Sequence, residues 1–223
     1  VSGSETTRGF FQNIADAIAF AAAGDTVNLK AQAYAEPIVV GKAITIKGAG
    51  REQTVIRPAV EPAADQYLNV VTVTSDGVTL KDLQVEGMNG SSRTRGVYVQ
   101  SAAGGNASVG ALSMNNVLLS LHQYGVLVDN DMVCDHLSMF NSRIANCGNG
   151  FHVLHKGTAT DVSIVSVTVD GCLYGISSNA QDGGFANAGS FTGVIQNCNV
   201  RENTLKGLYF EKLDHARIEG VDI

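Results

Sequence analysis

Glycine recurs through the second half of the chain at the head of a short apolar stretch, and this recurrence restricts the fold more than any other feature. Five glycines each open a segment of the form glycine, apolar residue, any residue, and in four of them another apolar residue follows. They are Gly96, Gly125, Gly150, Gly175 and Gly207. Their successive spacings are 29, 25, 25 and 32 residues. A period of this size is typical of a solenoid, and the longer intervals predict insertions in its loops.

A second column of polar or small residues follows the same period, and an aliphatic residue stands three positions after each. Its members are Asp82, Asn116, Asn141, Ser166, Asn197 and Gly220. Apolar and polar residues alternate within each repeat, as at Leu112 and Met114. This period of two predicts strands and excludes helix pairs. We therefore expect one all-β domain over residues 1–223, with coils over 25–223.

The opening segment, 1–24, predicts a helix that covers the first coil. Asn13 is suited to cap its start, and Gly24 stands just past its expected end. The apolar face would comprise Phe10, Phe11, Ile14, Ala17, Ile18 and Ala21. A solenoid needs such a cover because its core is otherwise open at the end. Short strands are expected next, at 26–30, 37–40, 43–47 and 54–57.

Three stretches rich in Gly, Ser and Asn, at 87–95, 100–110 and 179–190, are predicted to be loops. Such insertions often line the binding face of a repeat protein. Ile223 occupies a core column in the middle of a coil. We expect either that the sequence is truncated there or that another chain covers this edge, so self-association through the open C-terminal edge is a candidate interaction.

Composition and charge exclude several partners. The net charge is −6 and there is no basic run, which argues against a nucleic-acid partner. No stretch approaches the roughly 18 consecutive apolar residues of a membrane span, so no membrane partner is expected. The opening VSGSETTRGF lacks the features of a secretion signal. A mature secreted protein would show the same opening.

The cysteines leave two alternatives. Cys147 and Cys172 are 25 residues apart and share a column, so they should stack on adjacent coils about 4.8 Å apart. A disulfide is geometrically possible, and a pair of buried thiols that pack as small apolar groups is the favoured alternative. A zinc site is not expected because no CxxC or Cys/His cluster is present.

The stretch from Asn13 to Ile56, NIADAIAF through TVI, resembles the opening of pectin methylesterases and other members of the pectin-lyase-like superfamily. The shared features are the helix, the Gly-Asp-Thr-Val strand entry, a loop with tyrosine and an Ile-Thr-Ile-Lys-Gly-x-Gly strand. The resemblance implies a right-handed parallel β-helix with three sheets per coil and asparagines stacked in its tight turn. The Asn141 amide should then hydrogen-bond Asn116 and Ser166 on the neighbouring coils.

The catalytic motifs of that superfamily have no counterpart in this sequence. The pectin methylesterase segments Asp-Phe-Ile-Phe-Gly and Arg-Pro-Trp do not occur, and the chain has no Trp. The motifs of polygalacturonases, the Arg-x-Pro-x-x-Arg of pectate lyases and the Asp-Pro-His-Asp of alginate epimerases are also missing. The resemblance therefore predicts a fold, and a fold alone does not give an activity.

The columns also predict an outward ladder, because the third residue of each Gly-apolar-x-apolar strand points away from the core. This ladder comprises Tyr98, Leu127, His152, Ser177 and Tyr209. Tyr98, His152 and Tyr209 are candidate carbohydrate-binding residues because aromatic faces suit the C–H faces of sugars. The alternative is that these side chains only shield the sheet.

Titratable residues follow these strands at one end of the same face. A polysaccharide lyase needs a base and a positive charge that stabilises the enolate. His155 and Lys156 are candidate bases, and Glu211 is a third candidate catalytic residue. Asp129 and Asp131 are candidate Ca²⁺ ligands, although the register of a calcium loop is missing. The alternative is a solvated cluster of loop residues.

We expect a secreted or cell-surface protein whose partner is a polysaccharide or oligosaccharide, and which, if catalytic, is a relative of polysaccharide lyases acting on acidic polysaccharide. No cofactor is required by the sequence, and calcium is the candidate ion. The alternative function is a non-catalytic structural or adhesive β-helix domain of a surface protein or phage fibre. The missing motifs favour this alternative, whereas the ladder favours carbohydrate binding.

Overall fold

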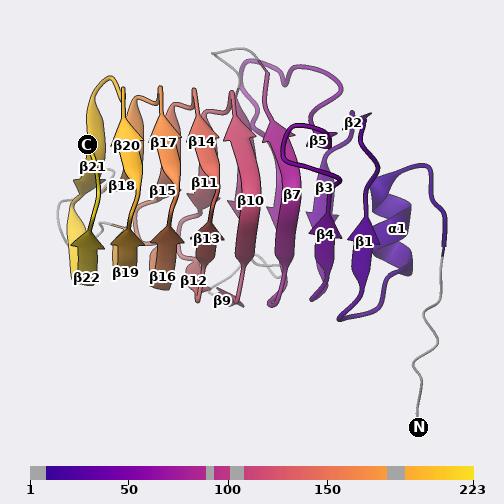
Figure 1. Cartoon of the computed structure of the whole chain (residues 1–223), viewed down its shortest axis with the longest axis horizontal. Helices are drawn as coiled ribbons and strands as arrows, with labels where there is room; N and C mark the ends of the chain where they lie inside the picture. The colour runs from indigo at the N-terminus through magenta and orange to yellow at the C-terminus, as the bar shows by residue number, and fades with distance from the viewer. Residues whose placement is uncertain (1–8, 89–92, 101–107, 180–188) are drawn as a thin grey trace, which may run out of the picture.

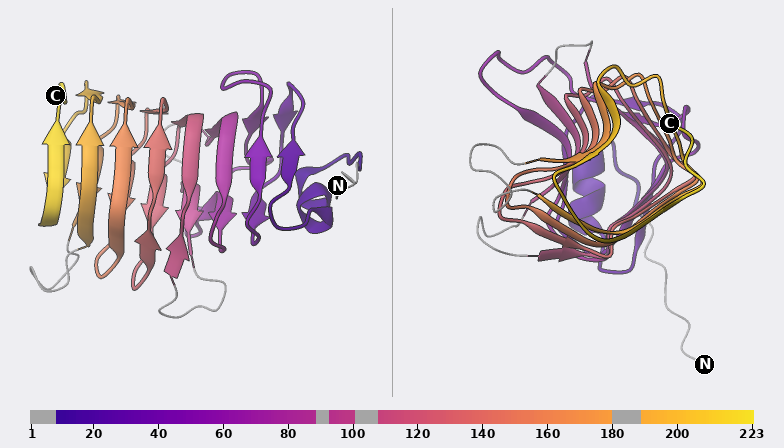
Figure 2. Two further views of the ribbon diagram at one scale, coloured as in Figure 1. Left: turned by 60° about the horizontal axis from the view of Figure 1, so that its bottom comes forward. Right: turned by 90° about the vertical axis from the view of Figure 1, so that its left-hand side faces the viewer.

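The structure is a computed structural model that describes residues 9–88, 93–100, 108–179 and 189–223. Within these ranges the chain winds into coils that stack side by side along one axis (Figure 1). Viewed along that axis, successive coils superimpose on one outline (Figure 2). The predicted parallel β-helix is confirmed. Each of the three predicted loops lies largely or partly outside the described residues, which do not include 89–92, 101–107 and 180–188.

One side of every coil contributes a strand to a seven-stranded parallel sheet. The strand order is β21-β18-β15-β11-β8-β6-β3. Its members are β3 (Ile38–Val40), β6 (Leu68–Val73), β8 (Thr94–Val99), β11 (Tyr124–Val128), β15 (Asn149–Val153), β18 (Tyr174–Ser178) and β21 (Lys206–Phe210).

The remaining sides form a fifteen-stranded parallel sheet that is folded at the corners of the coil. Its members are β1 (Thr26–Asn28), β2 (Ala33–Tyr34), β4 (Thr45–Lys47), β5 (Val55–Ile56), β7 (Thr79–Glu86), β9 (Ser108–Gly110), β10 (Ser113–Ser120), β12 (Val133–Asp135), β13 (Ser138–Phe140), β14 (Arg143–Ala145), β16 (Thr158–Val165), β17 (Thr168–Asp170), β19 (Ser190–Gln196), β20 (Asn199–Arg201) and β22 (Lys212–Glu219).

Left-handed backbone conformations make the corner between two sides of each coil. Strand β10 pairs with β13 through its first half and with β14 through its second half, so it crosses a corner at Asn116. Asn116 has φ 55°, and Asn141, which separates β13 from β14, has φ 47°. All six members of the predicted polar column have a positive φ. Asn, Asp and Gly suit this column because they enter the left-handed region at the lowest cost.

The side chain of Asn141 corrects one expectation. It is exposed, so a buried amide ladder through Asn116, Asn141 and Ser166 is wrong. Within this column one hydrogen bond is found between Asn116 Nδ2 and Asp82 Oδ1, at 2.8 Å. The corner thus depends on backbone conformation, and the side chains of Asn141, Ser166 and Asn197 are exposed.

The glycine column is confirmed, and close contact between coils explains it. A Cβ atom on Gly150 would lie 2.4 Å from the carbonyl oxygen of Gly175, and one on Gly125 would lie 2.6 Å from that of Gly150. Real Cβ atoms do not approach backbone this closely. Any side chain at these positions would therefore push neighbouring coils apart.

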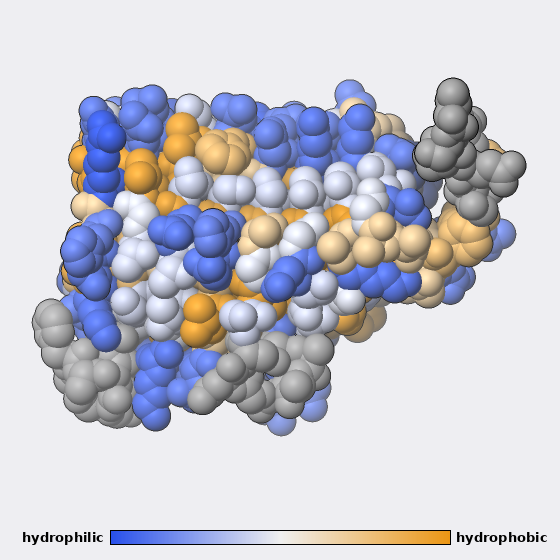
Figure 3. Space-filling model, turned by 90° about the horizontal axis from the view of Figure 1, so that it is seen from below, coloured by the Kyte–Doolittle hydropathy of each residue, from blue (hydrophilic) through white to orange (hydrophobic). Residues whose placement is uncertain are grey.

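Inward-facing residues form columns of their own and fill the interior. Val97, Val126, Phe151 and Ile176 are consecutive members of one such column, and each is fully buried. Because every coil repeats the same alternation, residues of similar polarity line up along the axis. The molecular surface accordingly shows strips of hydrophilic and less polar residues that run along the molecule (Figure 3).

Helix α1 (Ile14–Phe20) covers the first coil, as expected (Figure 1). The Asn13 side chain caps it by accepting a hydrogen bond from the backbone amide of Asp16 at 2.8 Å. Ile14 and Ile18 are buried, whereas Phe10 and Phe11 are 95% and 41% exposed. The two phenylalanines precede the helix, so their inclusion in its apolar face was wrong. None of the described helices is long and apolar enough to cross a membrane.

The four cysteines are buried and unbonded, in agreement with the favoured alternative. Cys147 and Cys172 lie on adjacent coils, and the amide of Leu173 donates to the carbonyl of Cys147 at 3.2 Å. Their thiols interact, which raises the pKa of Cys147 and lowers that of Cys172. Burial also raises the pKa of the Cys147 thiol.

Candidate functional site

The outer face of the seven-stranded sheet carries a group of aromatic and charged side chains that contact one another. Its first outward column consists of the residue before each column glycine. Its members are Arg95, Tyr124, Asn149, Tyr174 and Lys206. Tyr67, just before β6, joins this row, with its ring centre 6.4 Å from that of Tyr124.

The second outward column is the predicted ladder. Its members Tyr98, Leu127, His152, Ser177 and Tyr209 are in direct register across β8, β11, β15, β18 and β21. Their expected exposure is wrong for two of the three candidate binding residues. Tyr98 is 4% exposed and His152 is 3% exposed, whereas Tyr209 is half-buried.

Neighbouring outward side chains explain this burial. The Arg95 guanidinium lies over the Tyr98 ring, 4.6 Å from its centre, and the Tyr98 hydroxyl donates to Asp129. The His152 ring lies 5.5 Å from the ring of Tyr124. Long side chains of the first column therefore fold over the second, which alternation along one strand cannot reveal.

Arg95 occupies the centre of an aromatic stack. Its guanidinium carbon lies 4.3 Å from the centre of the Tyr67 ring and 4.6 Å from the centre of the Tyr98 ring, so it contacts both rings. Nη1 donates to the Asn69 side chain at a long 3.4 Å, and Nε is buried without a hydrogen-bond partner. No carboxylate of the described chain forms an ion pair with Arg95. Arg95 is thus a cation without an ion-pair partner among the described residues.

The carboxylates of this face are instead bound by tyrosines. Tyr98 donates to Asp129, and Tyr209 donates to Glu211 at 2.5 Å. Burial and the Asp129 interaction raise the pKa of Tyr98. The hydrogen bond to Glu211 raises the pKa of Tyr209. Both phenols therefore remain protonated donors at neutral pH.

His152 is a neutral residue in this setting. Burial lowers its pKa to about 4, and the side chain of Asn179 partly opposes the shift. Its Nδ1 lies 2.7 Å from the Ser177 hydroxyl oxygen, so the two groups share a hydrogen bond. A buried, neutral imidazole is poorly placed to sense pH near neutrality or to bind a sugar directly.

The candidate catalytic residues lie beyond the strand ends. His155 and Lys156 form the turn between β15 and β16, where Lys156 is exposed with φ 60°. His155 Nδ1 is buried without a hydrogen-bond partner in the described structure. Glu211 follows β21 and accepts from Tyr209. Their suggested roles as bases and as a third catalytic group stay predictions.

The two candidate calcium ligands, Asp129 and Asp131, lie just after β11. Asp129 already accepts a hydrogen bond from Tyr98, and Asp131 is exposed in a left-handed turn. Within the described ranges, the side chains that bring three potential ligand atoms together are Asp135, His136 and Asp161. This group includes neither predicted ligand. The suggested roles of Asp129 and Asp131 as Ca²⁺ ligands stay predictions.

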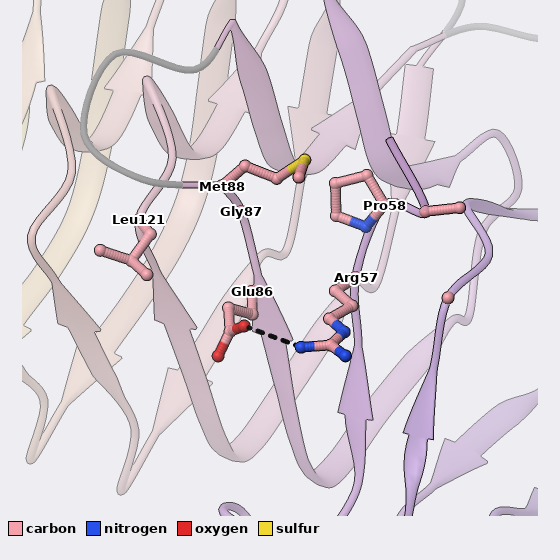
Figure 4. A pocket seen from close by; sticks show the side chains of 8 residues that line it. Arg57, Pro58, Glu86, Gly87, Met88 and Leu121 are labelled. Atoms are coloured by element: carbon pink, nitrogen blue, oxygen red, sulfur yellow. Dashed lines mark ion pairs between the residues drawn. The ribbon is translucent and has the colours of Figure 1, made fainter. Parts of the chain in front are cut away.

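A second candidate region lies where β5 and β7 end. It is a hollow of about 370 Å³ beside Arg57 and Glu86, with Pro58, Met88 and Leu121 around it (Figure 4). Arg57 Nη1 and Glu86 Oε1 face each other at 3.8 Å. This cation is thus neutralised within the protein, unlike Arg95. A larger hollow, about 530 Å³, is lined by residues 61–64 and Arg93, close to the Tyr67 stack.

Comparison with known proteins agrees with this architecture. No family model and no curated protein matches the sequence. Among solved structures, the A-module of the mannuronan C-5 epimerase AlgE4 from Azotobacter vinelandii matches 93% of this chain and 70% of its own, with 18% identity and a TM-score of 0.50. This chain has a right-handed parallel β-helix fold, as these solved structures do.

Other β-helix enzymes give weaker matches. A pectin methylesterase from Yersinia enterocolitica is 15% identical over 87% of this β-helix and 69% of its own chain, with a TM-score of 0.46. A PL6 family alginate lyase is 12% identical over 98% of this chain and 42% of its own, with a TM-score of 0.42. At these identities the likeness concerns the fold alone.

The sequence interpretation missed the first outward column of this β-helix. Arg95, Tyr124, Tyr174 and Lys206 each stand immediately before a column glycine. The sequence contains enough information to find this column, because residues at a fixed distance from the repeat glycines must lie on the same surface of the solenoid.

Proposed function

We propose that this β-helix binds acidic carbohydrate along the outer face of its seven-stranded sheet. The observation that carries the proposal is Arg95, a guanidinium stacked between Tyr67 and Tyr98 with no carboxylate partner among the described residues. A planar guanidinium recognises a carboxylate through paired hydrogen bonds. The hydrogen bond from Arg95 Nη1 to Asn69 is long, at 3.4 Å, which supports a ligand carboxylate taking its place.

Charge along the face supports an anionic ligand. Lys206 lies over the Tyr209 ring at 3.5 Å, and Arg93 lies over Tyr67 at 5.7 Å. Within the described residues, neither cation forms an ion pair. Asp129 and Glu211 keep their negative charges while they accept from tyrosines, so the three cations Arg93, Arg95 and Lys206 exceed the two acids by one charge, although the whole chain carries −6.

The exposed aromatic rings supply the second part of a sugar site. Tyr67 is 40% exposed, and Tyr124, Tyr174 and Tyr209 are half-buried. Tyr174 and Tyr209 rings lie 5.9 Å apart. Rings with one accessible face offer apolar area to the C–H face of a sugar at little cost in side-chain entropy. Tyr98 and His152 contribute by supporting this surface.

A lyase activity would extend the same proposal. His155 or Lys156 would take the proton next to a uronate carboxylate, and Glu211 would assist from the end of β21, two strands away in the sheet. The position of these residues beyond β15 and β21, at one end of the aromatic face, supports this assignment. A localisation outside the cytoplasm, secreted or at the cell surface, would suit a ligand of this kind.

The alternative, a structural or adhesive β-helix, is supported by the burial of Tyr98 and His152 and by the missing catalytic motifs. Under this alternative, the outward rings shield the sheet and bind no sugar. The two proposals differ in their response to one substitution at Arg95.

Calorimetric titration with uronate and neutral oligosaccharides tests the proposal. The wild type should prefer uronates, and Arg95→Gln should weaken uronate binding by about tenfold or more, since charged hydrogen bonds contribute about 1.5–3 kcal/mol. Arg201→Gln, an exposed arginine on β20, is the matched control and should bind as the wild type does. Absence of binding to any oligosaccharide would favour the structural alternative.

A separate assay addresses catalysis. β-Elimination creates an unsaturated product that absorbs in the ultraviolet, whereas hydrolysis does not. Product formation that disappears in both His155→Ala and Lys156→Ala would support the lyase assignment. Uronate binding without any product would leave the protein a carbohydrate-binding module.

A further inference from the structure

Cations and tyrosines occur together on the outer face of the seven-stranded sheet. Of the five strands from β8 to β21, two carry a cation in the first outward column, and the same two carry a tyrosine in the second. These pairs are Arg95 with Tyr98 on β8 and Lys206 with Tyr209 on β21. In both pairs the cation stands three residues before the tyrosine. The two strands therefore present the same pair of side chains, although three other strands lie between them.

On β8, Tyr98 lies between a cation and a carboxylate. The Arg95 guanidinium carbon is 4.6 Å from the centre of the Tyr98 ring, and the Tyr98 hydroxyl donates to Asp129. Both neighbours act on the same phenol, since burial raises the pKa of Tyr98, Asp129 raises it further and Arg95 opposes the shift. Asp129 is thus close to the cation, yet it accepts its hydrogen bond from the phenol.

On β21, the same arrangement is built from different residues. The Lys206 ammonium nitrogen lies 3.5 Å from the centre of the Tyr209 ring, and the Tyr209 hydroxyl donates to Glu211 at 2.5 Å. A lysine and a glutamate take the places of the arginine and the aspartate. This repetition indicates that the order of cation, phenol and carboxylate matters more than the individual side chains.

A phenol in this position competes with an ion pair. A carboxylate beside a guanidinium binds it through charged hydrogen bonds, often two at once. Those bonds would occupy the donors that recognise the carboxylate of an acidic ligand. Because the Tyr98 hydroxyl supplies Asp129 with a donor, the Arg95 donors stay available to such a ligand.

We propose that Tyr98 is a positioning residue whose hydroxyl holds Asp129 away from Arg95, so that this cation can bind acidic carbohydrate. Tyr209 acts in the same way on β21. The inference rests on the proposed function for its ligand, but the contacts among the side chains do not depend on one. It also gives a role to a tyrosine that is only 4% exposed and therefore offers a sugar little surface of its own.

A crystal structure of Tyr98→Phe tests the geometry without any ligand. This variant keeps the ring beside Arg95 and removes only the hydroxyl. Asp129 should then turn toward Arg95 and accept hydrogen bonds from its guanidinium at about 2.7–2.9 Å. An Asp129 carboxylate that stays apart from Arg95 in this variant would overturn the proposal.

Calorimetric titration with a uronate oligosaccharide measures the consequence for binding. Tyr98→Phe should weaken uronate binding about fivefold, the effect of one ion pair at a protein surface. In an Asp129→Asn background there is no carboxylate to pair with Arg95. The same Tyr98→Phe substitution should therefore change the affinity by less than about twofold in that background.

Tyr34→Phe is the matched control. It also removes a hydrogen-bonded hydroxyl, which accepts from the Lys30 amide at 2.9 Å, but it lies on β2 in the other sheet. This variant should bind uronate as the wild type does. An equal loss from Tyr98→Phe in both backgrounds would overturn the proposal, because the hydroxyl would then act on the ligand or the fold and not on Asp129.

The two proposals fail in different ways. If the wild type binds no uronate, the carbohydrate proposal is wrong, and the structure of Tyr98→Phe still decides whether the hydroxyl holds Asp129 away from Arg95. If the wild type binds uronate and Tyr98→Phe binds it equally well, the carbohydrate proposal stands and the role of Tyr98 is wrong.

Discussion

The Nδ1 atom of His152 lies 2.7 Å from the hydroxyl oxygen of Ser177 one coil further along, and both side chains are buried. This contact joins β15 to β18 through side chains on the outer face of the sheet. Because the pair is shielded from water, each group depends on the other for its hydrogen bond.

Ser177→Ala should lower the free energy of unfolding by about 1–3 kcal/mol, since it leaves the buried Nδ1 of His152 without its hydrogen-bond partner. Chemical denaturation would measure the loss. Ser138→Ala, on β13, removes a half-exposed strand serine and should change stability by less than about 0.5 kcal/mol. Equal effects from the two variants would show that the His152 contact contributes nothing.

Stability should fall as the pH drops below about 6.5. Burial lowers the pKa of both His122 and His152 to about 4, whereas an unfolded histidine titrates near 6.5. Between these values the unfolded chain binds more protons, so unfolding becomes more favourable as pH falls. The loss should total about 2–5 kcal/mol between pH 6.5 and 4.

Denaturation at several pH values would measure this slope. His122→Gln and His152→Gln should each flatten the profile, and His215→Gln, an exposed histidine on β22, should leave it unchanged. A profile that is flat in the wild type would contradict the assignment of two buried neutral histidines.

Gly150→Ala should destabilise the protein by about 2–4 kcal/mol, because its Cβ would lie 2.4 Å from the backbone oxygen of Gly175. Thermal unfolding would report the change. Gly110→Ala is the control, since the nearest atom to its Cβ is 3.6 Å away. A harmless Gly150→Ala would mean that adjacent coils separate more easily than the contact suggests.

Asn141 should tolerate glycine better than valine. Its side chain is exposed and its φ is 47°, so Asn141→Gly should be neutral within about 0.5 kcal/mol. Asn141→Val should cost about 1–2 kcal/mol because a β-branched residue resists the left-handed region. If glycine were as harmful as valine, the amide itself would be the stabilising group.

Register and corner positions could be predicted from the sequence because they depend on local backbone chemistry. Asn116 and Asn141 recur where the chain must turn, and Gly125 and Gly150 recur where coils touch. Both constraints act on every coil alike, so a single period reveals them.

Exposure could not be predicted in the same way, because it depends on side chains from a different column. Tyr98 points outward as expected, but Arg95 and Asp129 close over it. The ion pairs on the outer face of the seven-stranded sheet could not be predicted from the sequence for the same reason. Whether Asp129 neutralises Arg95 or binds a tyrosine is decided by side-chain geometry that no spacing encodes.

The in-register stacking of coils also sets how the molecule should yield to force. In the region of shortest repeats, each strand of a coil pairs with partners about 25 residues away on either side. A chain pulled from its ends would therefore release its coils one at a time. Each release would free roughly 25 residues, a length step of about 85 Å at the extension of a stretched chain. The extension trace would take the form of a staircase instead of a single rupture.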